Sequence, residues 1–523
     1  MGHRRIVVGL LGLLLCAASV AVAAADREID YTIADVEGHQ EITVSTPLAE
    51  YVFSEEGGVL KFLYLTFAPY GANVEELVPR RRTDPDIKAR QYDVDAEFPF
   101  ALVGETATEG IYALQEPTRP EEGTLEVSFV GAFGEATVTK RYTIHEDAIY
   151  TVDVRIIVEN PAEAALDLTM ILGTLSRDED TDNLYYMYNG EPGHDRLATS
   201  ADVSFDGLGV MSKAVVLFLS EAEGTDVEPF GEPTASGTRR FGVSMTAEGG
   251  TTDFRFSLYG GRRRYLLMEE AGLAALDQPG IAARMMIPVI QFLSMLYRAT
   301  GNYGWAIILF TILTRVILFP LMRKQYHSMA KMQKVQPKMK RIQERFKDDR
   351  QLQQQKVMEL YRKEGINPMS GCLPLLVQLP ILILIWRAIL YSGELIHLSP
   401  GFLWIPDLSM ADPYFILVIV TTGIMMLQQW LMSPTGSETS GTQKYFGYIF
   451  PLFMAVLLWR FPAGLWLYYL LTTATQVAQQ AIVNREMAAA DARLAPAADT
   501  EETEEIEAGD DNGDGDAGAE EGR

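Results

Sequence analysis

Short runs of alternating hydrophobic and polar residues fill the chain from about residue 27 to residue 276. Residues 41–46, 60–65 and 150–156 are examples, rich in β-branched and aromatic side chains, and turn residues such as Asn160-Pro161 separate such runs. Many short strands with few helical periods predict a large all-β sandwich. We place this domain at residues 26–276.

Beyond residue 305 the pattern changes to apolar runs of the length that crosses a bilayer as a helix, about 20 residues. Five runs are expected to be membrane spans: residues 305–321, 373–390, 414–431, 448–459 and 465–483. The predicted fold class is therefore multi-domain, with an all-β super-sandwich followed by an α-helical transmembrane bundle at residues 301–486.

Residues 277–300 join the two predicted domains. Arg284, Gln291 and Arg298 recur on one side of an otherwise apolar stretch that also contains Pro288. Such an amphipathic helix can lie in the headgroup region of a membrane. A helix packed on the β-domain would show the same pattern, so both interpretations stay open.

The first 25 residues have the charge order of a signal sequence. Arg4 and Arg5 precede an uncharged apolar run, which ends in small residues before Asp26. The run is also about long enough to be an uncleaved anchor helix, and both alternatives stay open. Lipidation at Cys16 is disfavoured because the bulky Leu15 precedes it. In every case the β-domain is expected outside the cytoplasm.

Loop charges predict the orientation of the spans. Residues 323–364 hold 13 Lys or Arg against 5 Asp or Glu, whereas residues 391–413 hold no Lys or Arg. The positive-inside rule places the first loop in the cytoplasm and the second outside. We therefore expect a multi-pass membrane protein, with its β-domain outside the cytoplasm and its C-terminus in the cytoplasm.

Arg315 lies within the first span, about 15 Å along the helix from Trp305. A cation at that depth costs at least ~2.5 kcal/mol in lipid, so Arg315 is expected to face protein, water or a negative partner. None of the five spans contains an acidic residue. Arg315 either creates a positively charged, water-filled cavity inside the bundle or extends to the cytoplasmic interface.

Other polar residues of the spans are candidates to line such a cavity, although they can equally form ordinary hydrogen bonds between helices. They are Thr311, Thr314, Gln378, Gln428, Thr472, Thr473 and Gln476.

Residues 323–365 predict an antiparallel pair of short amphipathic helices with basic outer faces. The candidate functional residues of this hairpin are Tyr326, Met329, Met332, Asp348 and Asp349. A solvated spacer and a docking surface are both consistent with this pattern.

Composition argues against several kinds of binding site and partner. The formal charge of −26 argues against nucleic acid as a sequence-specific partner. The two cysteines, Cys16 and Cys372, provide no disulfide framework, and the six histidines have no metal-ligand spacing. We expect no metal, no cofactor and no catalytic residues.

The acidic tail at residues 487–523 is expected to be disordered, with 12 Asp or Glu after residue 498. Residues 510–521 match the EF-hand calcium-loop pattern. No apolar helix flanks that stretch, so chance in a low-complexity sequence is the favoured interpretation.

A set of motifs between about residues 302 and 485 resembles the YidC family of membrane protein insertases (YidC/Oxa/Alb). They are Arg315 with Phe319-Pro320, Gln325-Tyr326, Gln336-Pro337, Asn367-Pro368, Gly371-Cys372 with Pro374, Gln378 with Pro380, residues 403–408, Asp412-Pro413-Tyr414, Met432 with Pro434, Phe461-Pro462-Ala463-Gly464 and Tyr468-Tyr469. More loosely, residues 51–58 and 257–260 resemble the periplasmic super-β-sandwich of Gram-negative members.

The resemblance implies an insertase without covalent chemistry or a nucleotide. Its hydrophilic groove, with Arg315 as the positive charge, would admit the polar flank of a nascent membrane protein whose apolar segment passes to lipid. The implied partners are nascent membrane proteins, the Sec translocon, ribosome–nascent chain complexes and membrane lipids. This chain departs from the family in its acidic tail, in the near absence of a spacer before the β-domain, and in Gly261-Arg262 in place of Pro-Lys.

Other functional classes fit less well. A transporter or channel requires internal repeats or intramembrane charge pairs, and neither is evident. A membrane-anchored carbohydrate enzyme would act through its β-domain, where Glu146 and Asp147 beside His145 are the available groups. An intramembrane protease requires a Ser/His or paired Asp set, which the spans lack.

Overall fold

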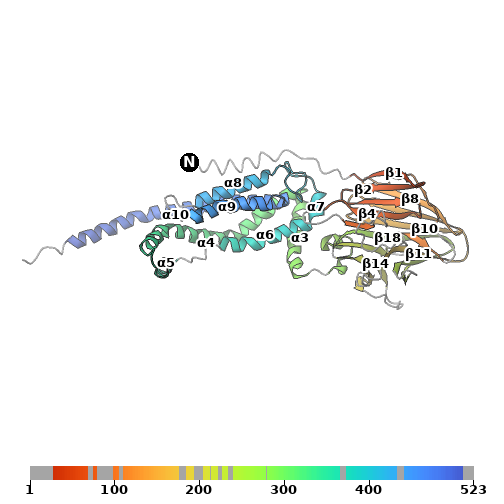
Figure 1. The fold of residues 1–523 in the computed structure, drawn as a ribbon, viewed down its shortest axis with the longest axis horizontal. Coiled ribbons are helices and arrows are strands. Elements are labelled where there is room, and N and C mark those ends of the chain that lie inside the picture. The colour runs from red at the N-terminus through yellow and green to blue at the C-terminus, as the bar shows by residue number, and fades with distance from the viewer. Residues whose placement is uncertain are drawn as a thin grey trace, which may run out of the picture. The chain divides into compact units, whose positions relative to one another are not determined.

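The structure, a computed structural model, describes residues 28–68, 75–78, 98–104, 110–175, 184–193, 204–212, 214–221, 227–233, 239–277, 280–365, 373–432 and 441–510 (Figure 1). Its internal contacts divide the chain into two compact units. The β-unit comprises Ala23–Pro288 and Leu390–Pro400, and the helical unit comprises Met1–Val22, Val289–Ile389 and Gly401–Arg523. The predicted signal or anchor helix at residues 1–25 lies outside the described residues.

The β-unit contains three sheets whose paired strands are antiparallel. The first has the order β1-β2-β3-β4-β5, with β1 (Asp30–Val36), β2 (His39–Ser45), β3 (Glu50–Ser54), β4 (Val59–Leu65) and β5 (Glu75–Val78). The second has the order β13-β12-β14-β15-β18-β10-β9-β8-β7, with β7 (Ala113–Leu114), β8 (Thr124–Phe133), β9 (Ala136–His145), β10 (Thr151–Asn160), β12 (Leu184–Tyr188), β13 (Glu191–Gly193), β14 (Phe205–Met211), β15 (Val215–Glu221) and β18 (Gly250–Arg262). The third has the order β16-β17-β11-β6, with β6 (Ala101–Val103), β11 (Leu166–Leu175), β16 (Val227–Pro233) and β17 (Arg239–Ala247).

Strand burial follows the alternation in the sequence. In β9 the side chains are buried at every second position, which places Tyr142 in the core and Arg141 on the opposite face. Tyr142 stacks on Phe53 with ring centroids 4.4 Å apart and donates its hydroxyl to the Gly58 carbonyl at 2.6 Å. Because such contacts join two sheets through one apolar core, a large β-sheet-rich domain is confirmed.

The β-unit also contains helical elements, so the expectation of an all-β domain was too narrow. After β18 the chain forms α2 (Tyr265–Glu270) and the 3₁₀ helix η3 (Ala274–Leu276). Leu267 and Met268 of α2 are buried in the core cluster. A third element, α7 (Gly393–His397), comes from much later in the chain.

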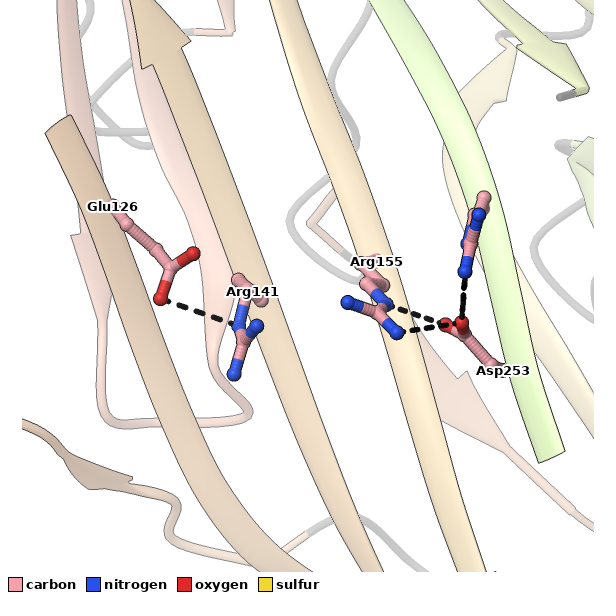
Figure 2. A network of polar contacts seen from close by, with 5 residues as sticks. Glu126, Arg141, Arg155 and Asp253 are labelled. Carbon is pink, nitrogen blue, oxygen red and sulfur yellow. Dashed lines mark hydrogen bonds and ion pairs between the residues drawn. The ribbon is translucent and has the colours of Figure 1, made fainter. Parts of the chain in front are cut away.

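A row of charged residues crosses the opposite face of the nine-stranded sheet (Figure 2). Arg141, Arg155 and Arg255 are direct cross-strand neighbours, an arrangement that would be repulsive by itself. Asp253 offsets it by accepting hydrogen bonds from Arg155 at 2.7 Å and from Arg255 at 2.9 Å. Glu126 pairs with Arg141 at 3.4 Å. The hydrogen bonds from Arg155 are the main cause of a lowered pKa of Asp253.

In the described part of the chain, seven helices lie wholly or mostly in the helical unit. They are α3 (Ile281–Thr300), α4 (Tyr303–Arg345), α5 (Arg350–Lys363), α6 (Leu373–Tyr391), α8 (Ile416–Met432), α9 (Gly441–Leu458) and α10 (Ala463–Asp510). The helix α3 contains Pro288 in its interior. Within the described residues, Tyr303–Arg323 is the one stretch long and apolar enough to span a membrane, and Gln378–Tyr391, Ile416–Trp430 and Tyr448–Leu458 are shorter apolar helices. Five membrane crossings therefore remain a prediction.

Two helices extend further than expected. The helix α4 runs without interruption from the first expected span to Arg345, so the first arm of the expected hairpin is not a separate short helix. The second arm, α5, lies beside it, with Lys338 Nζ 2.8 Å from Glu364 Oε1. The helix α10 continues to Asp510, through much of the tail expected to be disordered. Ala and Glu, which favour helix, dominate that stretch.

Candidate functional site

Arg315 is buried in the helical unit at 4% exposure, although neighbouring side chains of the same helix are exposed. Val316 and Ile317 are 64% and 65% exposed, whereas Thr311, one turn before Arg315, is fully buried. The helix α4 thus turns a polar stripe inward and an apolar surface outward. That arrangement is the reverse of a helix on a soluble protein, where the apolar stripe faces the core.

Three helices meet at Arg315 through hydrogen bonds. Arg315 Nη2 donates to Gln378 Oε1 of α6 at 2.6 Å, and Gln378 Nε2 donates to the Tyr468 hydroxyl of α10 at 3.1 Å. The guanidinium also interacts with the Tyr468 hydroxyl. A charged donor makes the bond to Gln378 stronger than a neutral one. Because both partners are neutral, these bonds orient the guanidinium and leave its positive charge in place.

Tyr468 was not among the candidates selected from the sequence. In an apolar span an aromatic residue resembles ordinary core packing, and Tyr468 is indeed buried at 1% exposure. The available signal was its hydroxyl, because a buried tyrosine hydroxyl usually has a hydrogen-bond partner.

The threonine candidates of the spans mostly use their hydroxyls within their own helices. Thr311, Thr314 and Thr473 each donate to a carbonyl three or four residues earlier. The structure therefore joins one of the polar candidates, Gln378, directly to Arg315. Three other residues were predicted to line the cavity around Arg315. Thr472 on α10 is buried, and Gln476 on α10 and Gln428 on α8 are half-buried.

A loop at residues 401–415 joins the N-terminal ends of α4 and α10. The Asn302 side chain, which caps α4, donates to the Gly401 carbonyl at 2.9 Å. The backbone amides of Ala463 and Gly464 donate to the carbonyls of this loop at 2.6 and 2.8 Å. Gly304 is required here, because a Cβ on it would lie 2.2 Å from the Phe402 ring.

Asp412 fixes the same loop to the start of α8. It is 1% exposed, and its carboxylate accepts hydrogen bonds from the Leu417 amide at 2.8 Å and the Tyr414 amide at 3.1 Å. It also accepts one from Trp404 Nε1 at 3.1 Å. A carboxylate at a helix N-terminus satisfies otherwise unpaired amides and interacts favourably with the helix dipole.

An ion pair joins α4 to α10 on the C-terminal side of Arg315, away from the loop at residues 401–415. Glu486 Oε2 lies 2.9 Å from Arg323 Nη2 and 3.8 Å from His327 Nε2. Arg315 lies between the two ends, roughly 20 Å along α4 from Asn302 and roughly 12 Å from Arg323 at 1.5 Å per residue.

The predicted hairpin residues have different roles. Asp349 caps α5 by accepting hydrogen bonds from the Gln351 and Leu352 amides, both at 3.0 Å. Asp348 is exposed in the turn. The other three, Tyr326, Met329 and Met332, lie on α4, and their side chains are outside the described part of the structure.

The alternative site in the β-unit consists of contacts that the sheet itself explains. His145 Nδ1 lies 3.3 Å from Thr124 Oγ1, its direct cross-strand neighbour, and His145 Nε2 lies 3.1 Å from Asp153 Oδ2 on the next strand. Glu146 and Asp147 lie in the turn after β9. Within the described residues no group of three His, Cys, Asp or Glu side chains could hold a metal ion.

Comparison with known proteins relates this chain to one family. The family model described as 60Kd inner membrane protein matches residues 295–490. A membrane protein insertase YidC of Geobacter sp. (strain M21) is 30% identical over 480 residues, which are 85% of this chain and 86% of that protein. The chain belongs to the YidC family.

Two further YidC proteins agree with this assignment. The YidC of Aeromonas hydrophila is 45% identical over 200 residues, which are 38% of this chain and 36% of that protein. A crystal structure of an active YidC insertase with its first transmembrane domain resolved covers 91% of this chain and 99% of its own, with 26% identity and a TM-score of 0.54. The resemblance inferred from the sequence motifs is therefore confirmed.

Proposed function

We propose that this YidC-family chain inserts nascent membrane proteins into the inner membrane through a hydrophilic groove that carries the charge of Arg315. Its relatives bear the name membrane protein insertase, which describes transfer into a membrane rather than an enzymatic reaction. The observation that carries the proposal is a buried guanidinium held by the neutral side chains of Gln378 and Tyr468. A cation oriented in this way remains able to attract a negative group.

The charge would act on the polar flank of a client. Two opposite unit charges 4 Å apart attract by about 4 kcal/mol at an effective dielectric constant of about 20. For an acidic client tail, attraction to Arg315 in the groove would therefore offset part of the hydration free energy that the tail loses when it leaves water. The client's apolar segment, of about 20 residues, then moves into lipid. Burial of that segment drives the step, and no nucleotide or covalent intermediate is required.

Exposed apolar side chains support a membrane location for the helical unit. Val316, Ile419 and Val456 on three different helices are 64%, 67% and 75% exposed. Such surfaces suit lipid and would be unfavourable in water. We propose five membrane-spanning helices at the five apolar runs, with α3 in the interfacial region.

The proposed topology is supported by the two ends of the helical unit. The loop at residues 401–415 has no Lys or Arg and joins the N-terminal ends of α4, α8 and α10, whereas the basic α4–α5 hairpin lies at the opposite end of α4. With the positive-inside rule, the β-unit and this loop lie in the periplasm, and the hairpin and the C-terminus lie in the cytoplasm. The loop contacts would then close the periplasmic end of the groove.

The proposed partners are nascent membrane proteins, which the relatives' name implies, together with the Sec translocon, ribosome–nascent chain complexes and lipids, which the family resemblance implies. The tail of this chain is acidic, so we do not assign ribosome contact to it. The basic outer surface of the α4–α5 hairpin is the better candidate for that contact, because it can attract the phosphates of ribosomal RNA.

Reconstitution tests this function. The purified chain is placed in liposomes, and a client with one apolar segment and a short acidic tail is synthesised in their presence. We expect the client tail to become protected from added protease well beyond its protection by empty liposomes. Equal protection in both preparations, with the chain folded and correctly incorporated, would contradict the proposal.

A further inference from the structure

Residues 390–400, which connect α6 to the loop before α8, belong to the β-unit. They contain α7 and are embedded rather than exposed: Ser392, Ile396 and Ser399 are 1% to 2% exposed. Leu398 packs against the apolar core of the β-unit. The β-unit thus encloses a segment that follows α6 and precedes the loop at residues 401–415 of the helical unit.

Glu394 is the charged centre of this segment. Its side chain is fully buried, with Oε1 3.2 Å from Arg264 Nε and 3.6 Å from Arg262 Nε. Arg262 is the last residue of β18, and Arg264 follows two residues later. Both are themselves largely buried, with side-chain exposures of 5% for Arg262 and 15% for Arg264. A buried carboxylate is tolerated only with such partners.

Arg264 also holds the start of the segment, and Phe67, to which Arg262 is bonded, contacts the end of α7. Arg264 Nη1 donates to the Leu390 carbonyl at 2.7 Å, and its guanidinium lies over the Tyr391 ring at 5.3 Å. Arg262 Nη2 donates to the Phe67 carbonyl at 3.1 Å, and the Phe67 ring stacks on His397 at 4.1 Å. The β-unit therefore contacts an acidic residue, the last turn of α6 and the rings of Tyr391 and His397 in one segment.

The end of β18 is shaped to place these arginines. Gly261 packs so closely on Tyr150 that a Cβ would lie 2.5 Å from its ring, so no larger residue fits. The Tyr259 hydroxyl donates to the Arg262 carbonyl at 2.7 Å. The departure noted at residues 261–262 thus has a physical reason, because the proline expected there would collide with Tyr150.

We propose that residues 390–400 are an intramolecular ligand of the β-unit, held in place by Glu394 between Arg262 and Arg264. The ion pairs act on α7, and the hydrogen bond from Arg264 to the Leu390 carbonyl acts on the start of the segment. Loss of the Glu394 carboxylate should therefore loosen the whole segment.

Hydrogen exchange on the full-length protein in lipid nanodiscs tests the docking. We compare the peptide covering residues 390–400 in wild type, Glu394→Gln and the control Glu270→Gln, which alters an exposed glutamate of α2. Docked amides exchange only when the segment opens. We expect exchange at least about tenfold faster in Glu394→Gln and no change in Glu270→Gln. Arg264→Gln, which removes the shorter ion pair to Glu394 and the hydrogen bond to the Leu390 carbonyl, serves as a second variant with a comparable increase.

Unchanged exchange in both Glu394→Gln and Arg264→Gln would overturn the docking proposal. Because the exchange experiment needs no client, its result stands independently of the proposed insertion function.

Discussion

Replacement of Gln378 by leucine tests whether the polar contacts around Arg315 are as the structure describes them. The substitution keeps a side chain of similar size and removes both hydrogen bonds, to Arg315 and to Tyr468. A hydrogen bond to a charged group contributes about 1.5–3 kcal/mol, and a neutral one about 0.5–1.5 kcal/mol. Gln378 is only half-buried, so water can replace part of the loss. We therefore expect Gln378→Leu to lower the free energy of unfolding of the helical unit by about 2 kcal/mol.

The assay is thermal unfolding in nanodiscs, followed by tryptophan fluorescence. For a unit of this size, about 2 kcal/mol corresponds to a decrease in Tm of roughly 4–8 °C. Gln355→Leu, the same change at an exposed position of α5, is the matched control and should have little effect. A double-mutant cycle with Arg315→Ala isolates the pair, and we expect an interaction energy of about 0.5–3 kcal/mol. A Tm unchanged by Gln378→Leu, or strictly additive effects in the cycle, would refute the described contact.

Two more predictions concern carboxylates outside the spans. Asp349→Ala should destabilise α5 by about 0.5–2 kcal/mol through loss of its N-cap, seen as faster hydrogen exchange in residues 350–363; unchanged exchange would mean that the cap is dispensable. Asp412→Asn places an amide group against a backbone donor and should cost about 1–3 kcal/mol, measured by thermal unfolding; an unaltered Tm would contradict its structural role.

The sequence predicted best those features that depend on local pattern. Alternation at residues 150–156 predicted a strand, which the structure forms as part of β10, and the apolar run from residue 305 predicted a helix with Arg315 inside it. The continuity of α4 was missed because a change from apolar to basic composition resembles an element boundary and because Pro320 and Pro337 are residues that usually interrupt helices. The helix nevertheless continues through both prolines to Arg345.

Contacts between distant segments were the features that the sequence could not supply. Gln378 was a candidate because it is polar in an apolar span, but its distance of 2.6 Å from Arg315 depends on how three helices pack. The burial of Glu394 was equally inaccessible, since a glutamate in a short loop normally remains in water. Only the fold brings it to two arginines that precede it by more than 120 residues.

The central claim is that the charge of Arg315 attracts the polar flank of a client, and one measurement tests it most directly. Cells depleted of their own insertase are complemented with this chain carrying arginine, lysine or alanine at position 315. Insertion is then measured for matched clients whose translocated tails are acidic or neutral. We predict that arginine and lysine support insertion of both clients and that Arg315→Ala impairs the acidic client most. Equal insertion of the acidic client by all three variants, at equal expression, would contradict the account.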